Sequence, residues 1–481
     1  MSNTTQALSR IEAILDDSSF VEIGARVTAR ATDFNMQEKK APSDGVITGY
    51  GVVNGNLVYV YSQDASVLGG TIGEMHAKKI ASLYEKAMKM GAPVVGLIDC
   101  AGLRLQEATD ALNGFGEIYK NMSLASGIIP QITAVYGECG GGLAVLAELS
   151  DFVFVEEKKA KLFVNSPNTL DGNYESKLDT SSAKFMAEAG VVDFVGDEET
   201  IANGVRQLVS MLPSNNAEGT VCTDNQDDLN RVCQDMEAEI ADPALALTDI
   251  SDDGVFVEAK AEYAKEMVTG FILVDGVTVG AVANRTALYD ENGEKAEEFA
   301  PVLTTAGAYK AAEFVTFCNA FEIPVLTLTN VKGFEATVKS ERTIAKAAAK
   351  LVYAFSNADV PKVNIITGEA YGSAYVAMNS KSIGADMVYA WPQASIGMMD
   401  ASLAAKIMYA DDIAASKDVT STINEKAAEY AALQSSVDQA AARGYVDTII
   451  NPEDTRKYVA AAFEMLFDKR EVRADKKHGT V

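Results

Sequence analysis

The chain has 481 residues and a formal net charge of −27, because 41 Lys and Arg stand against 68 Asp and Glu. An apolar fraction of 48% with 11 prolines excludes collagen-like and disordered chains, and the length suggests roughly two or three domains. So negative a protein is not expected to bind nucleic acid. The five cysteines form no CxxC pair, which indicates a reduced, cytoplasmic protein without a metal site.

The first half of the chain reads as a hairpin followed by alternating helices and strands. Two β-rich runs flank Asn54-Gly55, a strong signal for a tight hairpin turn. Continuous apolar runs between helical patterns then predict strands buried on both faces, which is typical of an α/β protein. No apolar run of about 18 residues and no signal-peptide layout occurs, so we expect neither membrane spanning nor export. We expect helices at 73–90, 111–126 and 144–149, and strands at 94–99 and 131–135.

The second half repeats the first. Gly102 and Gly333, like Gly141 and Gly372, are 231 residues apart, and the strand at 94–99 recurs at 325–330 with the same offset. The polar segment 213–230 has no apolar period and is typical of a linker. We therefore expect two duplicated α/β domains. The expected domains are 1–225 and 226–481, with helices of the second at 306–321 and 344–357.

A glycine-rich turn in each half is the strongest candidate for chemistry. The first turn spans 136–143 and the second 368–375, each between a strand and a helix. Bare backbone at a helix start lets a ligand oxygen approach unpaired N–H groups, so it can hold a phosphate or an oxyanion. Neither turn has the Lys-Ser/Thr or GxGxxG pattern of a phosphate loop, which favours an oxyanion hole. A purely structural tight turn is the alternative, and two copies at matching positions favour function.

The chain resembles the biotin-dependent carboxyltransferases of acyl-CoA carboxylases and decarboxylases, which consist of two tandem crotonase-like (ClpP/crotonase) domains. The likeness covers nearly the whole chain. It is carried by Ser62-Gln63-Asp64, Gly69-Gly70, Gly73-Glu74-Met75-His76, Arg104-Leu105-Gln106-Glu107, Gly141-Gly142, Ala370-Tyr371-Gly372, Gly384-Ala385-Asp386, Arg443-Gly444-Tyr445 and the tail Lys476-Lys477-His478.

The resemblance implies two oxyanion holes, because both the acyl-CoA thioester and biotin become enolates during transfer. It places the thioester oxygen at Gly141 and Gly142, and the biotin oxygen at Gly372, Ser373 and Ala374. The biotin nitrogen then removes the proton, so no side-chain base is required. The substrate-binding residues that we expect are Gly69, Gly70, Lys78, Lys79, Gly102, Arg104, Gly333 and Tyr371.

The same resemblance implies partners. The substrate is an acyl-CoA such as acetyl-, propionyl- or methylmalonyl-CoA, and biotin sits on a separate carrier protein. A biotin carboxylase or a membrane decarboxylase subunit completes the system, and partner subunits could bring this chain to a membrane. The family forms homo-oligomers, usually hexamers of dimer units.

Two departures from the family pattern leave alternatives open. Ser373 stands where a second glycine is usual, and Lys332 stands where a proline is usual. A catalytically silent structural subunit is therefore one alternative. A crotonase-type hydratase or isomerase is another, although such an enzyme would require a pair of glutamates in its pocket.

Overall fold

The computed structural model describes residues 5–30, 33–219, 221–290, 292–471 and 479. The chain divides into two compact units, Met1–Gly219 and Thr220–Val481. The division falls inside the polar segment 213–230, a few residues before the expected boundary after residue 225. The basic tail 476–478, which contributed to the family resemblance, lies outside the described residues.

The N-terminal unit is built on one mixed sheet with the order β1-β2-β3-β4-β5-β6-β8, while β7 pairs with the far end of β5. The strands β1 to β3 are antiparallel, and the others run parallel to β3. The strands are β1 (Val21–Ile23), β2 (Val46–Val53), β3 (Asn56–Gln63), β4 (Val94–Cys100), β5 (Gln131–Gly140), β6 (Phe152–Glu156), β7 (Lys161–Phe163) and β8 (Phe194–Gly196). The helices are α1 (Gln6–Ile14), α2 (Glu74–Met90), α3 (Ala108–Ala125), α4 (Gly142–Glu148), α5 (Asn173–Ser176), α6 (Ala183–Glu188) and α7 (Glu198–Met211).

The C-terminal unit repeats this sheet in the order β9-β10-β11-β14-β15-β16-β18, with β17 paired to β15. Its strands are β9 (Phe256–Ala259), β10 (Met267–Val274), β11 (Val277–Asn284), β12 (Ala287–Tyr289), β13 (Lys295–Glu298), β14 (Val325–Val331), β15 (Lys362–Tyr371), β16 (Met387–Ala390), β17 (Ser395–Gly397) and β18 (Thr448–Ile449). Its helices are α8 (Met236–Glu239), α9 (Pro243–Ile250), α10 (Thr305–Ala320), α11 (Val338–Glu341), α12 (Ile344–Asn357), α13 (Gly372–Ala377), α14 (Ala401–Met408), α15 (Ala410–Ala415), α16 (Val419–Tyr430), α17 (Val437–Ala442) and α18 (Thr455–Leu466).

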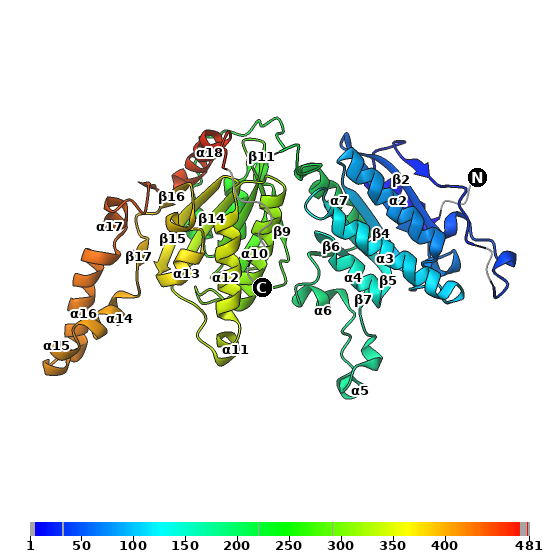
Figure 1. Cartoon of the computed structure of the whole chain (residues 1–481). Coiled ribbons are helices and arrows are strands. Elements are labelled where there is room, and N and C mark those ends of the chain that lie inside the picture. Colours follow the sequence, from blue (N-terminus) through cyan, green and yellow to red (C-terminus); the bar gives the residue numbers. More distant parts are fainter. Residues whose placement is uncertain (1–4, 31–32, 220, 291, 472–478, 480–481) are drawn as a thin grey trace. The chain divides into compact units, whose positions relative to one another are not determined.

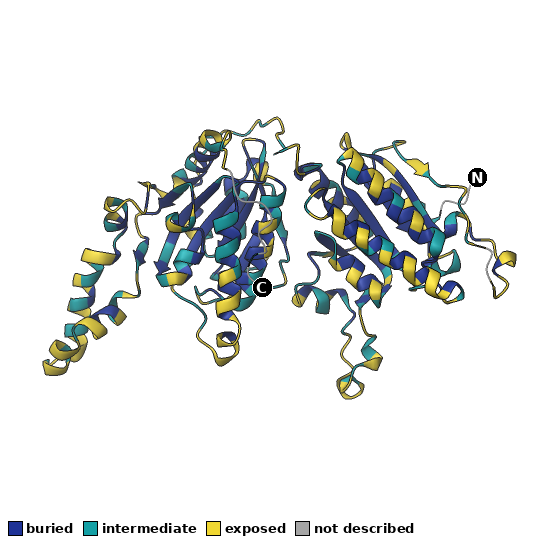
Figure 2. Cartoon of the chain, viewed as in Figure 1, coloured by how far each residue is buried: buried dark blue, intermediate teal, exposed yellow. Residues whose placement is uncertain are grey.

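The two sheets agree in register as well as in strand order, which confirms the duplication. Val94 of β4 pairs with Gln131 of β5, and Val325 of β14 pairs with Lys362 of β15, so the offset of 231 holds for both partners. In each unit two long helices pack side by side over one face of the sheet, α2 with α3 and α10 with α12 (Figure 1). The strands between the helical layers are almost wholly buried (Figure 2).

Helix α2 illustrates how the sequence specifies these elements. Its buried positions, which include Ala77, Ile80, Tyr84 and Ala87, recur every three or four residues and form one apolar face. Gly91 ends the helix in a left-handed conformation at φ +61°, which a glycine adopts without steric cost.

The expected glycine-rich turn at 136–143 is shorter in the structure. Strand β5 continues to Gly140 because β7 pairs with Glu138, Cys139 and Gly140 and supplies acceptors and donors for their backbone. Sequence alone could not show this pairing, since β7 is a short strand about twenty residues further along the chain. In the part of the chain that the structure describes, no helix is both long and apolar enough to cross a membrane.

Candidate functional site

In the N-terminal unit, two glycines lie at the carboxyl ends of neighbouring parallel strands. Gly102 follows β4 and Gly141 follows β5, and Cys100 of β4 is paired with Cys139 of β5, so both glycines lie at the same sheet edge. Gly102 has φ +104° and Gly141 has φ +65°, and a Cβ on either would meet no atom within 4 Å. The backbone at both positions therefore faces open space, as an approaching ligand atom requires.

The donor of this site is set by the start of α4. Gly142 is the first residue of α4, so its N–H and that of Leu143 have no acceptor within the helix. The N–H of Gly141 donates to the carbonyl of Phe163 at 2.8 Å. Gly141 therefore shapes the turn through its backbone conformation, and Gly142 and Leu143 present the free donors.

Gly142 must be glycine for a different reason from Gly141. A Cβ at Gly142 would lie 2.7 Å from a ring carbon of Phe115 and 2.7 Å from the hydroxyl of Tyr119. The Tyr119 hydroxyl also donates to the Gly142 carbonyl at 2.5 Å. The two rings thus hold the first residue of α4 at a distance that leaves no room for a side chain.

The C-terminal unit repeats the arrangement. Gly333 lies just beyond β14 and Gly372 directly follows β15, and Val331 is paired with Ala370 across these strands. Gly372 has φ +63°, close to the +65° of Gly141, and a Cβ at Gly333 would meet no atom within 4 Å. As Gly372 opens α13, the N–H groups in the first turn of that helix have no intrahelical acceptor.

Ser373 fits this second turn. Ser373 is the second residue of α13 and does not have a positive φ, so its N–H points along the helix as that of Gly142 does in α4. Lys346 and Lys350, with their flexible side chains, occupy the sequence positions that Phe115 and Tyr119 hold in the other unit. The ring contacts that restrict Gly142 are therefore missing, and Ser373 and Ala374 keep their N–H groups at the helix start.

Gly69 and Gly70 let their loop pack against the end of β4. Gly70 has φ +64°, and a Cβ there would overlap the carbonyl of Asp99. The Gly69 carbonyl accepts a hydrogen bond of 3.0 Å from the N–H of Ala101. Both glycines therefore lie beside the strand end that leads to Gly102, where they allow a close approach of backbone to backbone.

Arg104 is enclosed in the N-terminal unit. Its side chain is 1% exposed, and its guanidinium donates to Asp44 at 2.6 Å, to Glu107 at 2.8 Å and to the Thr71 carbonyl at 2.7 Å. Burial raises the pKa of Asp44, an effect that the charge of Arg104 opposes. These partners enclose the guanidinium, which argues against the expected contact of Arg104 with substrate.

The two lysines of α2 differ in their placement. The ammonium of Lys79 donates to the carbonyls of Ser43 and Val46 inside the unit, and burial lowers the pKa of Lys79 to about 8. Lys78 is half exposed and pairs with Glu74 at 2.6 Å, which raises the pKa of Lys78. The enclosure of Lys79 argues against the expected contact with substrate, whereas Lys78 could reach a ligand.

Tyr371 and His76 are buried and have partners within the fold. The hydroxyl of Tyr371 donates to Ser395 at 2.8 Å behind the second turn, and the residue is buried. His76 is fully buried with its ring nitrogens 2.9 Å from the Asp44 carbonyl and 3.2 Å from the Gln63 amide. Burial, with a smaller contribution from the charge of Arg104, lowers the pKa of His76 to about 3, so the imidazole is neutral.

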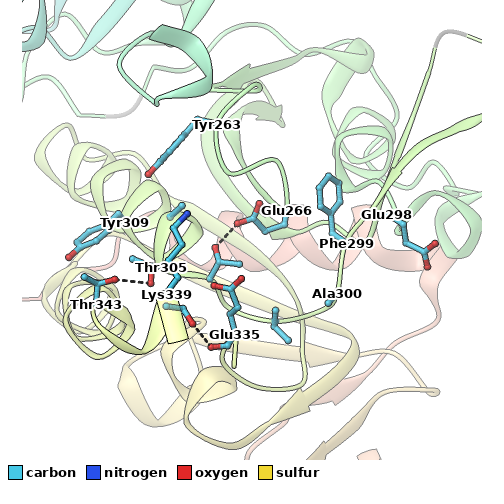
Figure 3. A pocket seen from close by; sticks show the side chains of 14 residues that line it. Tyr263, Glu266, Glu298, Phe299, Ala300, Thr305, Tyr309, Glu335, Lys339 and Thr343 are labelled. Carbon is cyan, nitrogen blue, oxygen red and sulfur yellow. Dashed lines mark hydrogen bonds between the residues drawn. The ribbon is translucent and has the colours of Figure 1, made fainter. Parts of the chain in front are cut away.

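The C-terminal unit has a cavity that the sequence analysis did not predict. It has a volume of about 680 Å³ and lies at the starts of α10 and α12 (Figure 3). The hydroxyls of Thr305 and Thr343 lie 3.3 Å apart on its wall, and Glu266 accepts a hydrogen bond of 2.5 Å from Thr304. Glu335, which follows Gly333, also lines it. Among the described residues, no group of three or more His, Cys, Asp or Glu could hold a metal ion.

Comparisons with known proteins agree over the full length of the chain. The carboxyl transferase domain family matches residues 2–481. The chain is 40% identical to the alpha subunit of methylmalonyl-CoA decarboxylase from Propionigenium modestum, over 99% of this chain and 92% of that protein. It is 39% identical to the propionyl-CoA carboxylase beta chain of Roseobacter denitrificans, over 99% and 93% of the two chains.

Solved structures give the same result for the fold. Transcarboxylase 12S, crystallised with methylmalonyl-CoA and methylmalonic acid, superposes on this chain with a TM-score of 0.91 at 35% identity. The match covers 99% of this chain and 92% of that one. The transcarboxylase 12S structure is described as a hexamer assembly.

Proposed function

Since the chain belongs to the carboxyl transferase family and is a biotin-dependent acyl-CoA carboxyltransferase subunit, we propose that its two glycine turns are the two oxyanion sites of carboxyl transfer. The observation that carries the proposal is the repetition of one geometry in both units. In each, a glycine with open space around it ends one strand, and a helix whose first N–H groups have no intrahelical acceptor begins behind a positive-φ glycine at the end of the next. One reaction that passes through two enolates would use such a pair.

In the N-terminal unit, the turn would receive the acyl-CoA. The N–H groups of Gly142 and Leu143 are fixed donors for the thioester oxygen, and Gly102 at the neighbouring strand end forms the opposite wall. Fixed donors stabilise charge as it develops, and each is commonly worth about 3 kcal/mol in the transition state. The half-exposed Lys78 is the best placed of the two α2 lysines for a CoA phosphate.

In the C-terminal unit, the turn would receive biotin. Its fit rests on the N–H groups of Ser373 and Ala374 at the start of α13 and on the open backbone at Gly333. Biotin, on a separate carrier protein, would supply the carboxyl group and a ring nitrogen that acts as the base. The residues of this chain then bind and orient the two reactants, which agrees with the neutral, enclosed state of His76.

The rest of the proposal concerns substrate, partners and assembly. We assign the acyl-CoA side to residues 1–225 and the biotin side to 226–481, with acetyl-, propionyl- or methylmalonyl-CoA as substrate. A biotin carrier and either a biotin carboxylase or a membrane decarboxylase subunit would be the partners. The likeness to transcarboxylase 12S supports a hexamer. The chain would work in the cytoplasm, and partner subunits would make any contact with a membrane.

Carboxyl transfer by the purified chain tests the proposal. The chain is incubated with free biotin and, in turn, with malonyl-, methylmalonyl- and ethylmalonyl-CoA, and loss of each carboxylated thioester is followed by chromatography. We expect loss that depends on biotin for at least one of them. Binding of acyl-CoA without transfer to biotin would contradict the proposal and favour a silent structural subunit. Hydration of an enoyl-CoA would favour the crotonase-type alternative.

A further inference from the structure

We propose that Arg104 is a positioning residue for the acyl-CoA oxyanion site, acting through Asp44 and Glu107; this inference rests on the proposed function. The three side chains are buried in the N-terminal unit and form one ion network. The guanidinium of Arg104 is occupied by partners within the unit. It fixes the loop that carries Gly102, which forms one wall of the site.

The network joins three separate segments of the chain. The guanidinium of Arg104 bonds to Asp44 ahead of β2, to the carbonyl of Thr71 ahead of α2, and to Glu107 at the start of α3. Arginine suits this position because its planar fork can donate in several fixed directions, whereas lysine offers one compact charge. The side chain thus ties the loops at this sheet edge into one rigid group.

The two carboxylates extend the network to the start of α2. Glu107 accepts a hydrogen bond of 2.6 Å from the N–H of Glu74, and Asp44 accepts one of 2.8 Å from the N–H of His76. Both donors belong to the first turn of α2, whose N–H groups have no acceptor within the helix. Arg104 holds the two acceptors in place and so fixes α2 relative to the end of β4.

The backbone carries this constraint to Gly102. The Gly102 carbonyl accepts from the N–H of Ile72 at 2.9 Å, and the Arg104 N–H donates to the Ile72 carbonyl at 2.9 Å. Gly102 has φ +104° and no atom within 4 Å of its would-be Cβ, so no side chain packs against it from that side. The position of the Gly102 backbone therefore depends on the hydrogen bonds that hold its loop. Arg104, two residues further along the chain, holds this loop through its buried side chain.

The second unit keeps the same backbone arrangement without an arginine at the equivalent position. Its backbone ladder is the same, since Leu303 donates to the Gly333 carbonyl at 2.9 Å and Glu335 donates to the Leu303 carbonyl at 3.0 Å. However, Glu335 occupies the position of Arg104 and faces the cavity of Figure 3, and Ser340 holds its carbonyl at 2.7 Å. At this position the ion network occurs in the N-terminal unit only, which is the unit that we assign to the acyl-CoA.

The test uses Arg104→Lys, which keeps the charge beside two buried carboxylates but loses the fork. The matched control is Arg456→Lys in the C-terminal unit, because Arg456 is equally buried and pairs with Asp252 at 2.6 Å. Both variants are assayed for kcat and KM at a temperature where circular dichroism shows them folded. Affinities for an acyl-CoA thioester and for its thioether analogue, which lacks the carbonyl oxygen, are measured by calorimetry.

We expect Arg104→Lys to lower kcat by about 10²-fold, as the loss of an oxyanion donor does. Its affinity for the thioether should equal that of the unmodified chain, while the preference for the thioester disappears. Arg456→Lys should keep kcat and that preference. Unchanged kcat in Arg104→Lys, an equal loss in Arg456→Lys, or a parallel loss of thioether binding would overturn the inference.

The binding comparison also separates the two proposals. If the unmodified chain transfers no carboxyl group but prefers the thioester, and Arg104→Lys loses that preference, the proposed function fails and the positioning role stands. If transfer occurs and Arg104→Lys retains both kcat and the preference, the positioning role fails and the proposed function stands.

Discussion

Replacement of Gly141 by alanine tests the first oxyanion site with the smallest possible change. Gly141 has φ +65° and ψ −128°, a conformation that residues with a Cβ rarely adopt. The added methyl would meet no atom within 4 Å, so the variant introduces no steric overlap with the protein. Its effects come from backbone strain and from a methyl in the space where the thioester oxygen would approach.

The two effects differ in size, and this makes the prediction quantitative. Strain at a single residue of this kind costs roughly 1–3 kcal/mol of folding stability. A turn that relaxes this strain moves the N–H of Gly142, and losing one donor costs about 10²- to 10³-fold in rate, or about 2.7–4 kcal/mol in the transition state. We therefore expect a modest loss of stability and a large loss of kcat.

The control is Gly55→Ala in the hairpin turn between β2 and β3. Gly55 has φ +85° and also has no atom within 4 Å of its would-be Cβ, so alanine there must also adopt a positive φ without steric overlap, away from the sheet edge that holds the site. Gly372→Ala probes the second site, where the methyl would lie 3.2 Å from the Met398 carbonyl. Urea unfolding, transfer to free biotin, and acyl-CoA affinity by calorimetry are measured for all three variants.

We expect Gly55→Ala to lose stability but keep kcat, and Gly372→Ala to lose transfer to biotin while it still binds acyl-CoA. The assignment of the two sites would be reversed if Gly372→Ala lost acyl-CoA affinity and Gly141→Ala kept it. Normal turnover by both Gly141→Ala and Gly372→Ala would refute the oxyanion reasoning altogether.

Three further predictions concern the two turns and His76. Gly142→Ala should lower the free energy of unfolding, measured in urea, by roughly 1–3 kcal/mol, because the added methyl overlaps Phe115 and Tyr119. Equal stability of this variant and the unmodified chain would contradict the steric argument. Ser373→Gly, the reverse change in the second unit, should leave kcat unaltered. Because the pKa of His76 is about 3 in the folded chain and 6.5 in the unfolded one, the unfolded state takes up the proton first as pH falls. Stability should therefore decline between pH 6.5 and 3, and His76→Gln should reduce that slope by up to about 1.4 kcal/mol per pH unit, measured by urea unfolding at each pH; identical slopes for the two proteins would count against a neutral buried His76.

The sequence by itself determined the duplication and the position of both glycine turns. The repeat at Gly102 and Gly333, and again at Gly141 and Gly372, reflects local backbone requirements at the ends of matching strands. A positive φ at a strand end is a property of a few consecutive residues, so it leaves a readable pattern of glycines. The helix at 344–357 was also predicted with the bounds that α12 has.

The tertiary structure alone decided which groups are free to act. The N–H of Gly141 is taken by Phe163 because a short distant strand adds to β5, and no local pattern reveals that partner. Arg104 follows a strand end, where a ligand contact would be expected from the sequence. In the structure its guanidinium pairs with Asp44, sixty residues earlier in the chain. Pairing between distant segments depends on how the loops pack in three dimensions. Once such a pair is buried, separating the two groups is costly, so the paired group is not free to bind a ligand.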